Sequence, residues 1–198
     1  MTEIKASDIA ALRAKCGLGM MECKKALTEA GGDEAKAIEI LRKKGAAKAE
    51  SKSERATTAG IVDCYIHAGN RIGVLIEVLS ETDFVAKNEE FKQFVHDIAL
   101  HIAAMSPKYV KRENVPAEEL EKEKELLMEQ AKTEGKPAEI AEKIVTGRIE
   151  KFYSEICLLD QPYVKDQETT VGELLTSKIQ KIGENLVISR FTRFEIGA

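Results

Sequence analysis

Histidine and cysteine are the side chains that most readily act as nucleophiles, bases or metal ligands, and both are sparse in this chain. Its three histidines are His67, His96 and His101. A thiol nucleophile needs a histidine base in reach, and a metal site needs several ligands at matched spacing. His101 follows His96 by five residues, a spacing that does not place two side chains on one face of a helix. The histidines therefore predict neither a metal site nor a general base.

The four cysteines are scattered, and even the closest pair, Cys16 and Cys23, has six residues between its members. Zinc knuckles and redox motifs use much shorter spacings. We expect buried free thiols, with no bound metal and no cofactor. A hydrolase that uses Cys16 or Cys64 stays open as an alternative, and it would require a thiol of depressed pKa with a histidine in reach.

Phosphate-binding signals are also weak. Gly17-Leu18-Gly19 is only a fragment of a dinucleotide fingerprint, it lies between expected helices, and no Gly-Lys-Ser or Gly-Lys-Thr follows. The net charge of −4 gives no overall attraction to a nucleic acid, and the basic stretch at 42–55 also carries glutamates. The sequence thus predicts no nucleotide site, no nucleic-acid partner and no enzyme.

The composition is that of a globular protein, with 43% hydrophobic and 32% charged residues. The N-terminus has no apolar signal region, and no window approaches the roughly 18 apolar residues that a membrane span needs. We therefore expect a cytoplasmic protein that does not enter a membrane.

The first 45 residues predict three short helices. The second runs from about Met20 to Ala30, and Asp33 is in place to cap the third. Glycine-containing breaks separate the helices, and Gly45 is the expected end of the third. We expect residues 1–45 to form a compact three-helix module, followed by a linker at 46–58.

The periodicity changes at residue 59. Two runs rich in β-branched residues, 60–66 and 72–79, are joined by a short turn and predict a hairpin. Apolar residues then recur at helical spacing from Phe84 to Ile102, which predicts a long amphipathic helix against one sheet face. A last extended run at 186–196 adds a third strand. The expected fold class is α+β, with residues 59–198 forming an antiparallel three-stranded sheet packed with helices.

A helical hairpin interrupts this core at 117–153. Two segments dense in glutamate and lysine, 117–134 and 138–153, are separated by Gly135-Lys136-Pro137. Their charges alternate in sign, as on solvated helix surfaces. Helical spacing returns at 172–182, before the last strand.

The segment Thr82-Asp83-Phe84-Val85-Ala86-Lys87-Asn88 lies where the second strand gives way to the long helix. In one interpretation Thr82 caps a helical turn, Asp83 complements its dipole and Phe84 fills the core. In the other, the segment is an exposed acidic and aromatic finger. The residues alone leave both open.

This segment resembles the signature of the elongation factor Ts family, and three further blocks resemble later or earlier parts of that family. The blocks are DIAALRAKCGLGMMECKKAL at 8–27, KPAEIAEKIVTGRIEKF at 136–152 and RFTRFEIG at 190–197. The first of them is similar to the family's ubiquitin-associated-like helical module. The resemblance extends over nearly the whole chain.

The resemblance implies a guanine nucleotide exchange factor of translation elongation. Such a protein binds elongation factor Tu with GDP, disturbs its Mg²⁺ and phosphate site, and promotes GDP release so that GTP can bind. It implies that Mg²⁺ is dislocated by Thr82, Asp83, Phe84 and Val85, and that the partner is bound by Arg13, Met20 and Met21 of the helical module.

The chain resembles the short, thermophile-type form of the family, which lacks a second copy of the sheet-and-helix unit. This implies a homodimer in which self-association supplies the missing half. An alternative of another class is a helical adaptor whose sheet is only a scaffold. That alternative predicts no effect on GDP release.

Overall fold

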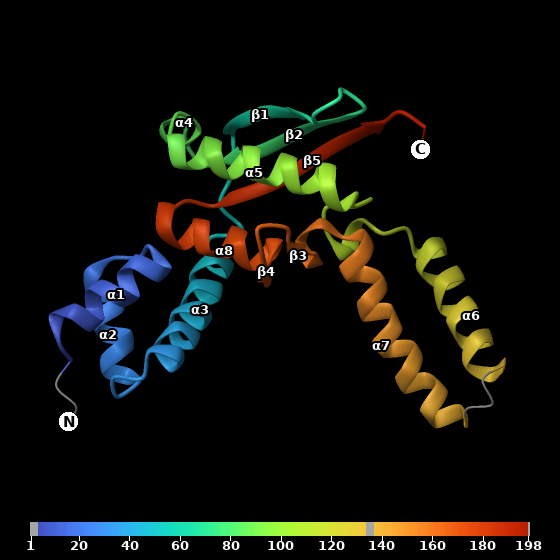
Figure 1. Cartoon of the computed structure of the whole chain (residues 1–198), viewed down its shortest axis with the longest axis horizontal. Coiled ribbons are helices and arrows are strands. Elements are labelled where there is room, and N and C mark those ends of the chain that lie inside the picture. Colours follow the sequence, from blue (N-terminus) through green and yellow to red (C-terminus); the bar gives the residue numbers. More distant parts are fainter. Residues whose placement is uncertain (1–3, 134–136, 198) are drawn as a thin grey trace. The chain divides into compact units, whose positions relative to one another are not determined.

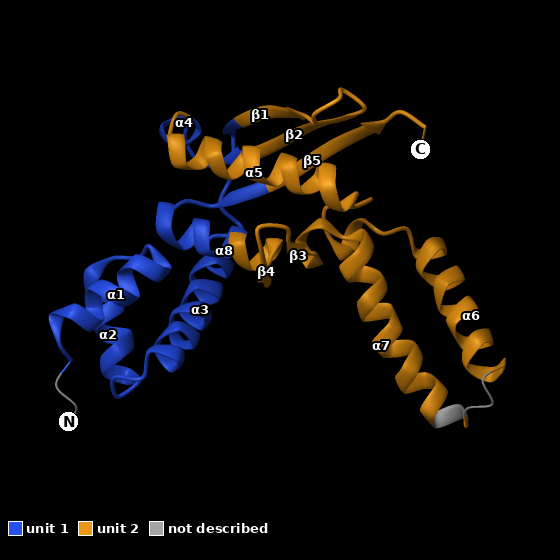
Figure 2. Cartoon of the chain, viewed as in Figure 1, with its two compact units in different colours: residues 1–60, 79–86, 175–187 blue, residues 61–78, 87–174, 188–198 orange. Residues whose placement is uncertain are grey.

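The computed structural model describes residues 4–133 and 137–197. It divides into two compact units (Figure 2). Unit 1 comprises 1–60, 79–86 and 175–187, and unit 2 comprises 61–78, 87–174 and 188–198. Each unit is therefore assembled from segments that are far apart in the sequence. None of the described helices is long and apolar enough to span a bilayer.

Unit 1 begins with the three predicted helices, α1 (Ala6–Cys16), α2 (Met20–Glu29) and α3 (Glu34–Glu50). Asp33 caps α3 as predicted, because its carboxylate accepts the N–H of Lys36 at 3.1 Å. The helices pack around one small core, whose buried members are Ile9, Leu12, Leu18, Cys23, Ala26, Leu27, Ala37 and Leu41.

The prediction that Gly45 ends the third helix was wrong, since α3 continues to Glu50. Gly45 is buried inside the helix, where the Gln180 side chain of α8 (Val171–Ile182) packs against it. A Cβ at this position would lie 2.4 Å from Gln180 Oε1. The glycine thus permits a close approach of two helices and has no role in helix termination.

The three-stranded antiparallel sheet is confirmed, with β1 (Ala59–Ile66), β2 (Ile72–Ser80) and β5 (Leu186–Glu195) in the order β1-β2-β5. The β1–β2 turn uses left-handed backbone at Gly69 and Asn70, the residue types that adopt it most readily.

The long helix α5 (Glu89–Met105) lies across the sheet (Figure 1). Asn88 caps it through hydrogen bonds from the N–H groups of Glu90 and Phe91 at 2.7 and 3.4 Å. Its predicted apolar face is buried at Phe91, Phe94, Val95, Ile98, Ala99 and Ile102. Phe84 belongs to a separate short helix, α4 (Asp83–Ala86), and not to this face.

The predicted helical hairpin consists of α6 (Ala117–Thr133) and α7 (Ala138–Ile156), which run side by side (Figure 1). They pack around Leu127, Val145 and Ile149. Gly135 and Lys136 of the expected turn lie outside the described residues, and Pro137 is the N-cap of α7.

Short elements complete unit 2. Two single 3₁₀ turns, Arg112–Asn114 and Leu158–Asp160, flank the helical hairpin. After the second turn, β3 (Pro162–Tyr163) and β4 (Asp166–Thr170) form a two-stranded antiparallel ladder that the sequence did not predict.

His101 is a fully buried polar residue on α5. Its Nδ1 accepts the N–H of Val164 at 3.1 Å, so the proton of the neutral ring lies on Nε2, which donates to Gln161 Oε1 at 2.9 Å. The amide of Gln161 donates in turn to the carbonyls of Met105 and Glu155. Burial lowers the pKa of His101 despite the hydrogen bond to Gln161. A second ring proton would also oppose the Val164 donor.

We predict that His101 makes the stability of the fold pH-dependent below neutrality. In the unfolded chain the histidine has a pKa of about 6.5. Because the pKa of the folded protein is lower, the stabilisation is present above 6.5 and is lost as the pH falls through the folded value. Urea unfolding at pH 7.5 and 5.5 should show a loss in the wild type. His101→Gln should be less stable at pH 7.5 but change less between the two pH values, and an equal change would refute the assignment.

Candidate functional site

Residues 82–86 of the segment that resembles the family signature lie in unit 1, where the end of β2 passes into α4 (Figure 2). Phe84 is 81% exposed, more than any other large apolar side chain in the described part of the chain. Asp83 is also exposed, and Thr82 and Val85 are half-buried. The interpretation in which Phe84 fills the core is therefore wrong. We call Thr82–Val85 the finger.

The finger is held by the carboxylate of Glu184, which follows α8. Thr82 donates its backbone N–H to Glu184 Oε2 at 3.0 Å and its hydroxyl to Oε1 at 2.7 Å. One interpretation of the sequence expected the Thr82 side chain to cap α4, but the hydroxyl donates to Glu184 instead. Ser80 adds a hydrogen bond to the Thr82 carbonyl at 2.9 Å. Both oxygens of one half-buried carboxylate therefore fix the residue from which the finger starts.

A second link joins the residue before the finger to the start of β5. Glu81 Oε1 accepts the backbone N–H of Asn185 at 2.6 Å and lies 3.5 Å from the guanidinium of Arg55. The buried Asn185 side chain donates to the carbonyls of Ser53 and Arg55 at 3.3 and 3.1 Å. We call the hydrogen bonds of Glu81, Thr82, Glu184 and Asn185 the clasp.

The segment after α3 is tied to the same turn. The ammonium of Lys52 is buried and donates to the carbonyl of Gly183. Burial lowers the pKa of Lys52, and the positive charges of Arg55 and Lys48 act in the same direction. Lys48 donates to the carbonyl of Gln180 at 3.4 Å. Two lysines thus bind the C-terminal carbonyls of α8, where the helix dipole favours positive charge.

The other candidate contact residues lie in the three-helix module. Arg13 is exposed on α1, next to the buried Leu12. Met20 and Met21 are the first two residues of α2, and both are exposed. Met20 is 49% exposed and Met21 is 64% exposed, so both present adaptable apolar surface at the start of α2.

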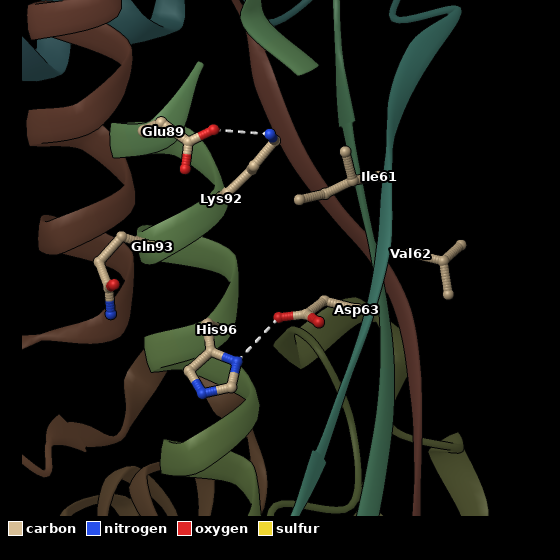
Figure 3. Close-up of a pocket in the computed structure, with 7 residues that line it drawn as sticks. All are labelled: Ile61, Val62, Asp63, Glu89, Lys92, Gln93 and His96. Carbon is tan, nitrogen blue, oxygen red and sulfur yellow. Dashed lines mark hydrogen bonds and ion pairs between the residues drawn. The ribbon is translucent and has the colours of Figure 1, made fainter. Parts of the chain in front are cut away.

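Two of the histidines considered for chemistry lie in different surroundings. His101 is part of the core of unit 2, whereas His96 Nδ1 lies 3.0 Å from Asp63 Oδ2 in a shallow pocket between β1 and α5 (Figure 3). The pocket lining contains no serine, threonine or cysteine, so this pair has no nucleophile to activate. The lining residues are Ile61, Val62, Asp63, Glu89, Lys92, Gln93 and His96.

Two of the four thiols, Cys23 and Cys157, are buried. Burial raises the pKa of both Cys23 and Cys157 to about 11. In the described residues there is no group of three or more histidine, cysteine, aspartate or glutamate side chains that could hold a metal ion.

Three residues of the clasp, Glu81, Glu184 and Asn185, were not predicted as site residues. Gly183-Glu184-Asn185 was interpreted only as a turn before the last strand. A glutamate and an asparagine beside a glycine are common in turns, and Thr82 lies 102 residues earlier in the chain than Glu184. No local signal connects the two segments.

Comparison with known proteins gives the family. Residues 37–198 match the family described as Elongation factor TS. The chain is 61% identical over 195 residues to Elongation factor Ts of Alkaliphilus oremlandii, covering 98% of this chain and 90% of that protein. It is 57% identical over 194 residues to Elongation factor Ts of Moorella thermoacetica, covering 98% and 96%. The chain therefore belongs to the elongation factor Ts family, and it is a nucleotide exchange factor for elongation factor Tu in translation elongation that performs no covalent chemistry.

Proposed function

We propose that the finger enters the GTPase domain of elongation factor Tu beside its nucleotide, and that Phe84 separates the elements that hold Mg²⁺ and phosphate. The observation that carries this proposal is the exposure of Phe84 on a four-residue helix. A phenyl ring left in water gains about 1.5–3 kcal/mol when a partner buries it. Burial of this ring in a complex therefore contributes binding free energy that the isolated chain does not gain.

Exchange requires that burial of Phe84 stabilise the complex with one state of the partner more than the complex with the other. A ligand shifts an equilibrium only by its difference in affinity for the two states, so the finger must bind the nucleotide-free partner more tightly than the GDP form. By linkage, GDP then weakens the binding of the exchange factor by the same factor. The Asp83 carboxylate fits this role, since a negative charge near the phosphates competes with the nucleotide for positive groups.

In this proposal the three-helix module contributes binding energy that does not depend on the nucleotide. Arg13, Met20 and Met21 present a cation and two adaptable apolar side chains. Uniform binding of this kind lowers the partner concentration needed for half-maximal exchange without changing the maximal rate. The module and the finger thus have separable effects.

We also propose a homodimer formed by the face of the sheet that is turned away from α5. Val62 points away from α5, whereas Asp63 points toward it (Figure 3). On β2, Gly73 lies against Ile66, because a Cβ there would be 3.1 Å from Ile66 Cδ1. Leu75 follows on the same face of the strand.

The last strand extends this outer face. Arg190 bonds Glu77, which shares its face with Leu75, and Phe194 lies four residues further along the same face of β5. Arg193 bonds the Ala103 carbonyl of α5, in agreement with this assignment. A second copy that packed its own sheet here would bury the exposed apolar side chains Val62, Ile66, Leu75 and Phe194.

The first prediction for the finger concerns Phe84→Ala. Because the ring is exposed, the substitution should leave the melting temperature nearly unchanged but slow GDP release roughly tenfold or more, which corresponds to about 1.4 kcal/mol per tenfold step. Stopped-flow release of a fluorescent GDP analogue measures the rate. The matched control is Phe91→Ala in the core, which should lose about 3–5 kcal/mol of stability. Its folded fraction should exchange GDP normally. A normal rate for folded Phe84→Ala would exclude the wedge.

A second prediction concerns Glu184, which we regard as a positioning residue for the finger. Glu184→Ala leaves the N–H of Thr82 without its acceptor and should cost about 1–3 kcal/mol of stability. The maximal exchange rate should fall more than the half-saturating partner concentration rises. Glu184→Gln keeps one acceptor oxygen and should be intermediate.

The control is Glu119→Ala, which removes a carboxylate that likewise accepts two hydrogen bonds, from Lys108 and Tyr109. It should retain the wild-type maximal rate. An equal loss of rate in Glu119→Ala and Glu184→Ala would reduce the clasp to a contribution to stability alone.

A third prediction tests the dimer by analytical ultracentrifugation at micromolar concentration. Leu75→Glu should produce monomers, because two carboxylates would be buried across the sheet faces. Leu126→Glu on α6 is a matched control, since Leu126 and Leu75 are 50% and 49% exposed. This control should remain dimeric. A monomeric wild type across that range would contradict the proposal.

A further inference from the structure

Two thiols meet inside the three-helix module. Cys16 is the last residue of α1, and Cys23 lies in the first turns of α2. Their Sγ atoms are 3.5 Å apart. Cys16 is half-buried and Cys23 is fully buried in the core of the module. The pair was not predicted as a unit, because its spacing in the sequence matches no redox motif.

This separation is close to that of a bond. A disulfide has an S–S distance of about 2.05 Å, so the sulfurs need to approach by about 1.5 Å. Rotation of the two side chains together with a small displacement of the first turn of α2 supplies a shift of this size. The connecting segment contains Gly17, which has left-handed backbone, and Gly19, which has an extended one, so the chain there tolerates adjustment.

We propose that Cys16 and Cys23 form a redox-active dithiol, which a hydroperoxide converts into an intramolecular disulfide that weakens binding of the partner. This inference rests in part on the proposed role of Met20 and Met21. Cytosolic disulfides are typically of this transient, sensing kind. Cys16 is the more accessible thiol and meets the oxidant first.

The reaction balances in two steps. The Cys16 thiolate attacks one oxygen of hydrogen peroxide, the O–O bond breaks, and a sulfenic acid and hydroxide form. This hydroxide takes the proton of Cys23, and the Cys23 thiolate attacks the sulfur of Cys16, so that the S–S bond forms and the S–O bond breaks. The released hydroxide ions take up the two thiol protons as water. Two thiols lose two electrons, and one peroxide is reduced to two molecules of water.

Cys23 is suited to the second step and not to the first. Burial raises its pKa to about 11, and the neighbouring Cys16 thiol and Glu22 act in the same direction. Cys23 therefore stays protonated at neutral pH and does not compete for the oxidant. Its position against Cys16 allows it to capture the sulfenic acid before further oxidation.

The disulfide would act on the partner-binding surface. The loop that it closes contains Met20 and Met21, the exposed methionines at the start of α2. Drawing Cys23 toward Cys16 shifts this first turn and the two side chains with it. The finger is outside the loop. Oxidation should therefore raise the half-saturating concentration of elongation factor Tu roughly fivefold to tenfold and leave the maximal exchange rate unchanged.

The experiment uses the full chain with Cys64→Ser, which removes the exposed thiol that would join two chains. Protein treated with hydrogen peroxide is alkylated under denaturing conditions and digested for mass spectrometry. We expect a peptide cross-linked between Cys16 and Cys23, the loss of two hydrogen atoms, and reversal by dithiothreitol. Circular dichroism before and after oxidation checks that the fold is retained.

Cys16→Ser in the same background is the control, and peroxide should not change its exchange kinetics. Sulfinic or sulfonic acid at Cys16 without the cross-link would overturn the dithiol, and a cross-link with unchanged half-saturation would overturn its effect on binding. Partner binding by the double variant Met20→Ala/Met21→Ala, measured without oxidant, separates the proposed role of the methionines from the proposed dithiol. Normal partner binding by that variant would refute the role of the methionines and leave the cross-link as an independent result.

Discussion

The hydrogen bonds from Thr82 to Glu184 are the interaction on which the finger depends. A four-residue helix has almost no stability of its own, because helix nucleation is unfavourable and such a helix makes too few hydrogen bonds to offset it. Phe84 cannot anchor α4 either, since its ring is turned to solvent. The position of the finger is therefore set at its first residue, where Glu184 binds both the backbone N–H and the hydroxyl. This arrangement leaves the apolar side chain free for a partner.

The clasp also explains how the compact unit is assembled. Asn185 and Gly183 bind the segment that follows α3. Glu184 binds Thr82 of the finger, and the backbone N–H of Asn185 donates to Glu81, the residue before the finger. The turn at 183–185 is thus the common point of three stretches that are distant in sequence. A buried asparagine and a buried lysine are appropriate here because every donor requires a fixed acceptor.

The sequence predicted the elements whose signals are local. Helical spacing located the buried face of α5, and β-branched runs located the three strands of the larger sheet, β1, β2 and β5. The sequence did not predict the role of a residue whose contact lies far away in the chain. Gly45 has the residue type of a helix terminator, but its missing side chain accommodates Gln180. Thr82, where the finger starts, is likewise bound by a carboxylate 102 residues away, which no pattern within the finger reveals. The family resemblance, and not periodicity, led to the finger.

The arrangement of exposed apolar groups follows from the task of a nucleotide exchange factor. An enzyme concentrates its interaction energy in a pocket, but an exchange factor has no small substrate and must act on the surface of a folded partner. Under the proposed function the groups that act on the partner have to protrude, and Phe84 is exposed next to a residue whose backbone the clasp fixes. The same reasoning applies to Met20 and Met21, which the core of the three-helix module supports from behind. At both places an ordered backbone carries an exposed apolar side chain. Under the proposed function, little conformational entropy is therefore lost when the partner binds.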